Sequence, residues 1–377
     1  MSEHQYVAFR AIDRPVDKKN LAYMRDQSSR AEITPWSFDN EYEYGDFHGN
    51  APEMLRRGYD IHLHYADFGI RTLLIRLPHG LPNAAAAKPY FGKDSPRILK
   101  DKQRDGVILH VEACYEPGDL EDLWEFDDLL DRLKPLRNEI LDGDLRPLYL
   151  MHLAMAVDGN HDPAETKESP VPAGLAALSD AQRALAEFYG LSESLISAAA
   201  RNSPPLPSRD DPSDERAAWL RGIAQSKKDA WLIQLLSDAE AAVRAEILAE
   251  FQKSRPAPAW PTVAGNRTIA ELESAAVEVE EETTRKAAEK AARQRAKRLV
   301  EMAADPKATL RETESLVKER SRDAYDRIAQ LLAELRQALA GSRQSGLADQ
   351  QALKLNRDNP TLKSLVGALR REGFLPK

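Results

Sequence analysis

The sequence predicts an α+β protein, with a small mixed or antiparallel sheet in its N-terminal domain followed by an irregular, all-helical region that resembles helical repeats. Alternating β-branched and aromatic residues, typical of strands, are confined to the first third. Helical periodicity, helix caps and proline-rich breaks fill the remainder. We therefore expect an α+β domain at 1–117, a helical domain at 118–253, a proline-rich linker at 254–267, and a long charged helix with helical hairpins at 268–377.

The N-terminal domain begins with a predicted strand at 5–12. Asp17 can cap a following helix that buries Leu21 and Met24. Two extended segments follow at 31–33 and 38–44, and Pro52 fits the first turn of a short helix that ends at Arg57.

A β-hairpin is the clearest local signal in this domain. Residues 60–65 alternate polar and apolar side chains, 67–69 (Asp-Phe-Gly) supply the turn, and 70–77 form the returning strand. A last strand is predicted at 106–114. No strand is expected after Leu120.

The rest of the chain reads as helices separated by breaks. Helices are predicted at 119–133 and 145–157, and Ser179 with Gln182 forms a capping box. Polar or proline-rich segments at 161–172, 202–212 and 254–266 separate them from short helices between 217 and 251, whose spacing resembles that of solenoid proteins. A long helix at 268–304 precedes three final helices.

Composition restricts the classes of function. The formal net charge of -8 argues against binding nucleic acid over the whole surface, which needs a cationic protein. The single cysteine, Cys114, cannot form an intrachain disulfide, which fits a reducing compartment. The first residues do not resemble a signal peptide, and the longest apolar stretch, 148–157, is too short to span a bilayer. We expect a cytoplasmic protein without a membrane partner.

Asp60, His62 and His64 form the most suggestive chemical motif. Residues two apart on a strand share a face, so these three side chains project together, and two imidazoles at this spacing can bind one metal ion. The segment is similar to the His-x-His strand of amidohydrolase-type and of polymerase-and-histidinol-phosphatase-type metal hydrolases. Those families need further ligands downstream, and this chain has no histidine after His161. The alternative interpretation is a polar, solvent-facing side of a half-buried sheet.

The long helix has an acidic first half and a basic second half. In the basic half, Lys286, Lys290, Arg293 and Lys297 follow one another at steps of four, three and four residues and form one stripe. Such a stripe is either a solvated helix face or a surface that contacts a phosphate backbone.

Two segments resemble known families. Residues 6–15 (YVAFRAIDRP), 28–35 (SSRAEITP) and 45–47 (GDF) resemble the start of an uncharacterised bacterial protein family, for which no activity is established. The tail from 316 to 374, above all 324–332 (AYDRIAQLL), is similar to the helical tail of SWIM-type zinc-finger proteins. The Cys-x-Cys and Cys-x-His zinc ligands of that family are absent, so the resemblance implies a helical scaffold without the zinc site.

The chain contains no Walker-type phosphate loop, no dinucleotide-binding glycine run, no zincin helix and no nucleophile elbow. Together with the helical majority, this favours a non-enzymatic interaction or scaffold protein that binds a partner protein through helical surfaces and needs no cofactor. Two rival hypotheses stay open. One is a metal-dependent hydrolase or nuclease centred on Asp60, His62 and His64. The other is a nucleic-acid accessory factor that uses the basic stripe.

Overall fold

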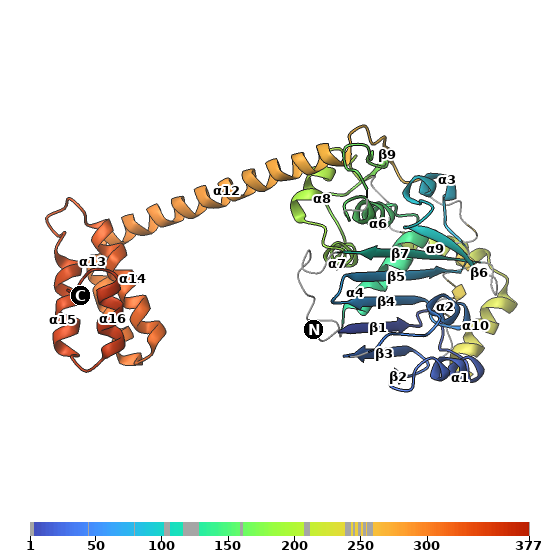
Figure 1. The fold of residues 1–377 in the computed structure, drawn as a ribbon, viewed down its shortest axis with the longest axis horizontal. Helices are drawn as coiled ribbons and strands as arrows, with labels where there is room; N and C mark the ends of the chain where they lie inside the picture. The colour runs from blue at the N-terminus through green and yellow to red at the C-terminus, as the bar shows by residue number, and fades with distance from the viewer. Residues whose placement is uncertain are drawn as a thin grey trace. The chain divides into compact units, whose positions relative to one another are not determined.

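The computed structural model describes residues 4–43, 45–78, 80–101, 106–115, 128–158, 161–206, 212–237 and 259–376, together with 243, 246–247, 250–251 and 254. The chain divides into two compact units, residues 1–280 and residues 281–377, and each is described by itself. Figure 1 labels the helices and strands.

A seven-stranded sheet forms the centre of the first unit, and the predicted α+β class is confirmed. The strand order is β2-β3-β1-β4-β5-β7-β6, and all the paired strands are antiparallel. The predicted hairpin is present as β4 and β5. The strands are β1 Gln5–Arg10, β2 Glu32–Ile33, β3 Ser37–Tyr42, β4 Ile61–Ala66, β5 Ile70–Leu77, β6 Arg97–Asp101 and β7 Gly106–Cys114.

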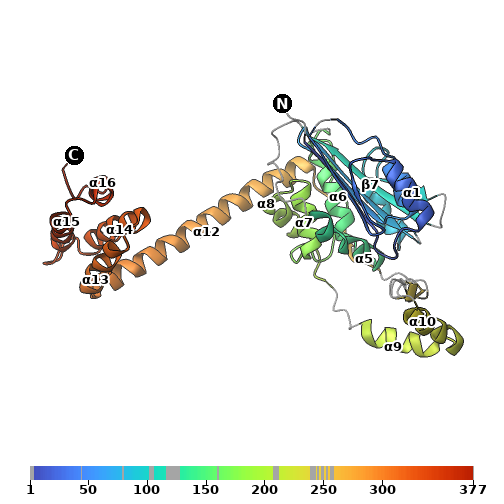
Figure 2. The ribbon, with the colours of Figure 1, turned by 90° about the horizontal axis from the view of Figure 1, so that it is seen from below.

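Helices cover both faces of this sheet, as Figure 2 shows with α1 on one side and α5 and α6 on the other. On one face, Val7, Phe9 and Leu74 pack with buried residues of α1 and α2. On the opposite face, Leu63 and Leu73 belong to a larger core that includes residues of α4 to α8. The interpretation that β4 has a polar side facing solvent is therefore wrong for His62, which lies on the face covered by α1 and α2.

Helix caps form where the sequence predicts them. The side chain of Asp17 accepts a hydrogen bond from the amide of Asn20, and Ser179 and Gln182 form a reciprocal capping box. The described helices of the first unit are α1 Lys18–Asp26, α2 Ala51–Arg57, α3 Ala84–Ala87, η1 Lys88–Tyr90, α4 Leu129–Leu133, α5 Pro135–Leu141, α6 Arg146–Ala156, α7 Asp180–Phe188, α8 Glu193–Ala200, α9 Pro212–Gly222 and α10 Gln225–Ser237. Most of the helix predicted at 119–133 lies outside the described residues.

The stretch predicted as a separate helical domain shares its core with the sheet. Leu130, Leu150 and Phe188 belong to the same hydrophobic cluster as the strand residues. Trp260 and Ile269, from the predicted linker and the start of the long helix, join that cluster as well.

The prediction of no strand after Leu120 is wrong. A two-residue strand, β8 Val171–Pro172, pairs antiparallel with β9 Thr262–Val263. Both lie in segments predicted as linkers, where prolines hide the alternation that reveals a strand. Strand β6 was also not predicted, because this short edge strand buries only Asp101 fully and so shows no apolar alternation.

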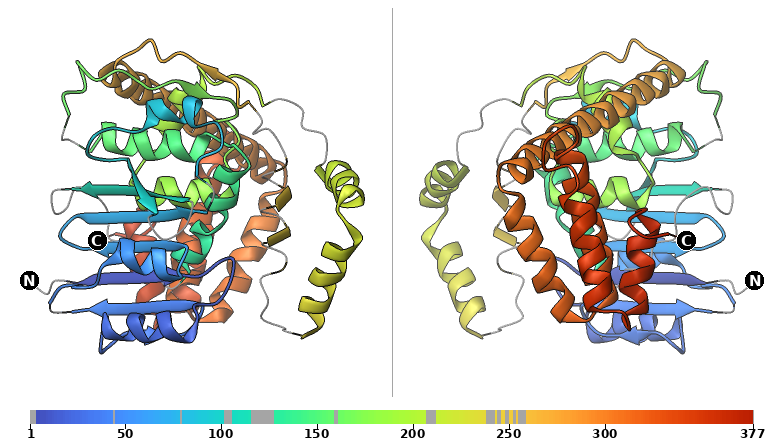
Figure 3. Two further views of the ribbon diagram at one scale, coloured as in Figure 1. Left: turned by 90° about the vertical axis from the view of Figure 1, so that its right-hand side faces the viewer. Right: turned by 90° about the vertical axis from the view of Figure 1, so that its left-hand side faces the viewer.

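Helix α12, Ile269–Ala304, begins in the first unit and ends in the second. The helices that follow are α13 Pro306–Leu316, η2 Val317–Glu319, α14 Arg322–Ala338, α15 Leu347–Asp358 and α16 Lys363–Arg371. They lie side by side in Figure 3 and share a core of their own.

Four α-helices thus occupy residues 306–371, and the prediction of three is wrong. The additional helix is α15. Its buried face consists of Ala348, Gln351, Ala352 and Leu355, and this mixture of small and polar residues gives a weak apolar period.

No helix within the described ranges has both the length and the apolar character that crossing a bilayer requires.

Candidate functional site

Asp60 lies immediately before β4 and is almost completely buried. Its Oδ2 accepts hydrogen bonds from the backbone amides of Ile12 and Asp13, at 2.7 and 3.2 Å. Its Oδ1 lies 3.1 Å from a guanidinium nitrogen of Arg76. The carboxylate therefore fixes the end of β1 and neutralises a buried arginine of β5.

Arg76 and Arg137 extend this contact into a buried ionic network. Arg76 also donates to Asp101 of β6 at 2.9 Å. Arg137 of α5 donates to the carbonyl of Arg76 and to both carboxylate oxygens of Asp13. A buried charge is tolerated when it is paired and hydrogen-bonded, and removal of one partner is costly. The network thus joins α5 to the strands that it covers.

His62 is buried against the aromatic ring of Phe9 on the neighbouring strand. The two rings are stacked with their centroids 4.1 Å apart, and the imidazole Nδ1–H donates to the carbonyl of Ala8 at 3.0 Å. Burial lowers the pKa of His62 well below its usual range, and the nearby His64 lowers it further. His62 is therefore a neutral side chain within the packed core.

His64 points to the same face and lies next to Gln5. Its Nε2 donates to the side-chain carbonyl of Gln5 at 2.9 Å, and the Gln5 amide donates to Asp46. Burial lowers the pKa of His64, while Glu112 and Asp46 act in the opposite direction. The cross-strand register brings His64 opposite Thr72, and Thr72 opposite Glu112.

The fold therefore places a polar cluster on this face that the sequence did not predict. Arg97 of β6 donates from Nε to Nδ1 of His110 at 2.7 Å, and His110 Nε2 lies 3.4 Å from Glu112. The hydrogen bond from His110 is the largest cause of the lowered pKa of Glu112. The alternation of His110, Glu112 and Cys114 along β7 is the only sequence signal for this cluster, and it does not reveal which strands lie beside it.

The candidate catalytic residue Asp60 and the two candidate metal ligands each have a partner within the fold: Asp60 has Arg76, His62 has Ala8 and His64 has Gln5. Within the described part of the chain, no group of three or more histidine, cysteine, aspartate or glutamate side chains is arranged to hold a metal ion. Among the described residues, the fold therefore brings to His62 and His64 no further metal ligand of the kind that the metal-hydrolase hypothesis requires.

Helix α10 exposes a set of large aliphatic side chains. Trp231 is buried, whereas Leu232, Ile233, Leu235 and Leu236 are 57, 62, 50 and 88% exposed. This helix is one of the short helices predicted between 217 and 251. Of its apolar residues Trp231, Leu235 and Leu236, only Trp231 is buried.

The basic stripe of α12 is exposed along its full length. Lys286 lies 2.7 Å from Glu282, and Lys297 lies 3.8 Å from Glu301. Lys290 and Arg293, between them, form no ion pair with any residue that the structure describes. These two cations are therefore available to an anionic partner.

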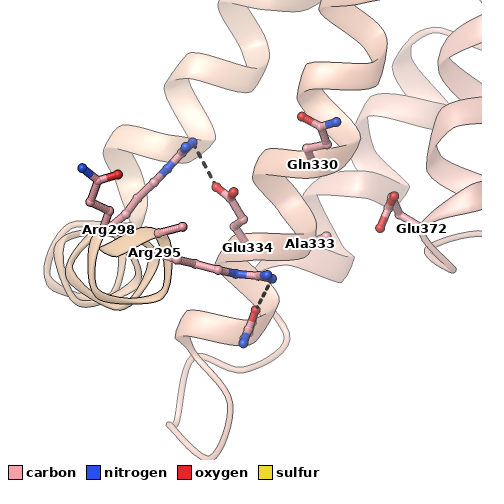
Figure 4. Close-up of a pocket in the computed structure, with 9 residues that line it drawn as sticks. Arg295, Arg298, Gln330, Ala333, Glu334 and Glu372 are labelled. Carbon is pink, nitrogen blue, oxygen red and sulfur yellow. Dashed lines mark hydrogen bonds and ion pairs between the residues drawn. The ribbon is translucent and has the colours of Figure 1, made fainter. Parts of the chain in front are cut away.

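A second surface of α12 faces α14 and forms a cavity of about 680 Å³ (Figure 4). In it Arg298 is paired with Glu334 at 2.9 Å, and Arg295 donates to the neutral amide of Gln337. Its lining residues on α12 are Ala291, Gln294, Arg295 and Arg298. At 3.6 residues per turn, these positions lie on a different side of the helix from the basic stripe.

The two units differ in charge. Residues 281–377 contain 21 lysines and arginines and 14 aspartates and glutamates, a formal net charge of +7. Because the whole chain has a net charge of -8, residues 1–280 carry -15. The cationic character is thus concentrated in the second unit.

Comparison of the chain with known proteins finds no matching protein family, no matching curated protein and no matching solved structure. The resemblances of the N-terminal segment and of the helical tail stay predictions.

Proposed function

We propose that this protein is a non-enzymatic interaction protein of the cytoplasm, and that it binds a partner protein by laying α10 into an apolar groove of that partner. The observation that carries the proposal is the exposure of four large aliphatic side chains on one short helix. The cytoplasmic assignment is supported by the single cysteine, which suits a reducing compartment.

The spacing of the exposed residues suits recognition of a helix by a groove. Leu232, Leu235 and Leu236 follow the i, i+3, i+4 pattern and lie on one side of α10. Grouped apolar side chains on a protein surface are unfavourable in water and mark interaction sites. Full burial of Leu236, which is mostly exposed, would stabilise a complex by roughly 1.5–3 kcal/mol, and burial of the half-exposed Leu232 and Leu235 by about half as much each.

The residues around this apolar face indicate what kind of surface the partner must present. Ala230 and Gln234 lie on the opposite side of α10 and are exposed as well. The large aliphatic side chains thus lie on one side of the helix and smaller or polar residues on the other, and the matching surface is a groove with an apolar floor and a polar rim.

The buried polar groups of the first unit support a binding role over catalysis. Asp60, Arg76 and His62 make the contacts that hold the strands and helices together. Most of the exposed large aliphatic side chains of the described residues, by contrast, lie on helices, as do the cations of the basic stripe. The repeat-like character of the helical region stays a prediction.

The test compares two double variants of α10 in pull-downs from the native cell with quantitative mass spectrometry. Leu232→Asp with Leu236→Asp places two charges on the apolar side, and Ala230→Asp with Gln234→Asp places the same charges on the opposite side. We expect a protein that is captured equally by the wild type and the Ala230/Gln234 variant, and at least about tenfold less by the Leu232/Leu236 variant.

Equal capture of every protein by both double variants would contradict the proposal. So would a large loss of stability in the Leu232/Leu236 variant alone, because it would show that these leucines are covered by the protein itself. Urea unfolding followed by tryptophan fluorescence measures that stability.

A further inference from the structure

A second exposed surface, distinct from α10, has a different chemistry. Between residues 285 and 298, α12 carries seven arginines and lysines and a single acid, Glu289. Successive members of the stripe are separated along the helix axis by about 6, 4.5 and 6 Å, at 1.5 Å per residue. Lys286, Lys290, Arg293 and Lys297 thus form a row about 16 Å long.

We propose that this stripe binds the phosphate backbone of double-stranded nucleic acid without regard to its sequence. Duplex DNA carries one negative charge per about 1.7 Å of its axis with both strands counted, so a length of about 16 Å contains roughly ten phosphates, about five on each strand. Lys290 and Arg293, at the centre of the row, form no ion pair with any described residue that a phosphate must displace, and Glu289 is the one acid close to them on the helix.

The side chains between the cations indicate which class of anionic partner this surface suits: a duplex, a single strand, a membrane or a protein. The other residues from 285 to 298 include five alanines, one glutamine and Glu289, with no aromatic and no large aliphatic residue. A membrane-surface helix inserts tryptophan, phenylalanine or leucine into lipid, and proteins that bind single strands stack bases on aromatic rings. A partner protein would likewise be anchored by large apolar groups. A duplex backbone needs only cations.

The charge of the two units sets the strength of this binding. The stripe belongs to the unit of net charge +7, whereas the remainder carries -15. Acidic residues are also present earlier in α12, among them Glu280 and Glu281. Binding should therefore be weak and steeply dependent on salt, because ionic strength screens each cation–phosphate contact.

The experiment uses the full chain and a fluorescent 20-base-pair DNA duplex of arbitrary sequence, with anisotropy recorded from 50 to 200 mM salt. Four phosphate contacts predict a slope of about -3.6 in a plot of log affinity against log salt concentration. Lys290→Glu with Arg293→Glu removes two of these contacts. The magnitude of the slope should therefore fall by about two, and binding at 50 mM salt should weaken at least tenfold.

Lys307→Glu with Arg343→Glu is the matched control, since both side chains are exposed in the same unit and the change in net charge is identical. This control should retain most of the affinity. The Leu232/Leu236 variant of α10 should bind the duplex like the wild type, which separates failure of this inference from failure of the proposed function.

Three results would overturn the inference. The first is no anisotropy change for the wild type at 50 mM salt. The second is an equal loss of affinity in the Lys307/Arg343 control, which would show that only the overall charge matters. The third is tighter binding to a 20-nucleotide single strand or to phosphatidylserine vesicles than to the duplex.

Discussion

His62 shows how much of a residue's role depends on strands that are distant in sequence. Its position on a strand, two residues from His64, is correctly predicted from the alternation around it. Its burial is not, because Phe9 and Ala8 lie more than fifty residues away and become neighbours only through the β1–β4 register. The same holds for Asp60, whose partners Arg76 and Asp13 come from other elements.

Burial of His62 as a neutral group makes the first unit sensitive to acid. The unfolded chain titrates this histidine near pH 6.5, while its pKa in the folded protein is lower. Below pH 6.5 the unfolded state therefore binds more protons, and the free energy of unfolding falls as pH falls. The stabilising contribution is fully present above pH 6.5. Each such histidine contributes a slope of up to about 1.4 kcal/mol per pH unit below it.

We expect His62→Gln to lower stability at pH 7.5 and to flatten the loss of stability between pH 6.5 and 5.5. All five tryptophans precede residue 281, so tryptophan fluorescence during urea unfolding reports on the first unit. His161→Gln is the control, because the His161 side chain is 54% exposed. A His62→Gln variant with the pH slope of the wild type would refute this assignment. His64 and His152, whose pKa values are also lowered by burial, should maintain the remaining slope.

At the scale of elements, the sequence predicts the helices and strands that have strong local signals and misses those whose signals are weak. The β4–β5 hairpin and the capped helices α1 and α7 have alternating side chains or cap residues, which act within a few positions. Strands β6, β8 and β9 and helix α15 lack such signals. They form because contacts with the surrounding core stabilise them, and those contacts involve residues that are distant in sequence.

Gly69 at the turn of the hairpin provides a test at this scale. Its φ of +109° is a conformation that side chains disfavour, and a Cβ atom there would lie 1.9 Å from the carbonyl oxygen of Tyr115. Gly80 has a φ of +81° with no atom within 4 Å of its would-be Cβ. We expect Gly80→Ala to cost about 1 kcal/mol from backbone strain alone. Gly69→Ala should cost at least about 2 kcal/mol more, because the backbone must move.

Urea unfolding followed by tryptophan fluorescence measures both glycine variants, since both residues lie in the first unit. Equal destabilisation by the two substitutions would show that the approach of Tyr115 to the turn is not tight in the folded protein.

At the scale of the whole molecule, the division between the units falls within a helix. The sequence places a boundary at the start of the long helix, whereas the compact units meet at residues 280 and 281. The reason is that the first turns of α12 bury Ile269 and Leu272 in the core of the first unit. Farther along α12, Met302 belongs to the separate core of the second unit.

This separation predicts that residues 281–377 fold without the rest of the chain. Their core contains Leu332, Leu335, Leu365 and Leu369, all fully buried within the unit. Glu281 and Glu282 would begin the fragment's first helix, where acidic side chains interact favourably with the helix dipole. We expect the isolated fragment to be helical by circular dichroism and to unfold cooperatively in urea.

Leu332→Ala connects this fragment to the intact protein. Deletion of a buried leucine side chain in a core typically costs 2–5 kcal/mol, so the fragment's transition should move to clearly lower urea. In the full chain the same substitution should shift the circular dichroism transition and leave the tryptophan transition in place, since the second unit contains no tryptophan. An unfolded fragment, or a tryptophan transition that moves with Leu332→Ala, would mean that the two cores depend on each other for stability. Any function assigned to α10 or to the basic stripe would then have to be tested on a chain whose halves cannot be perturbed independently.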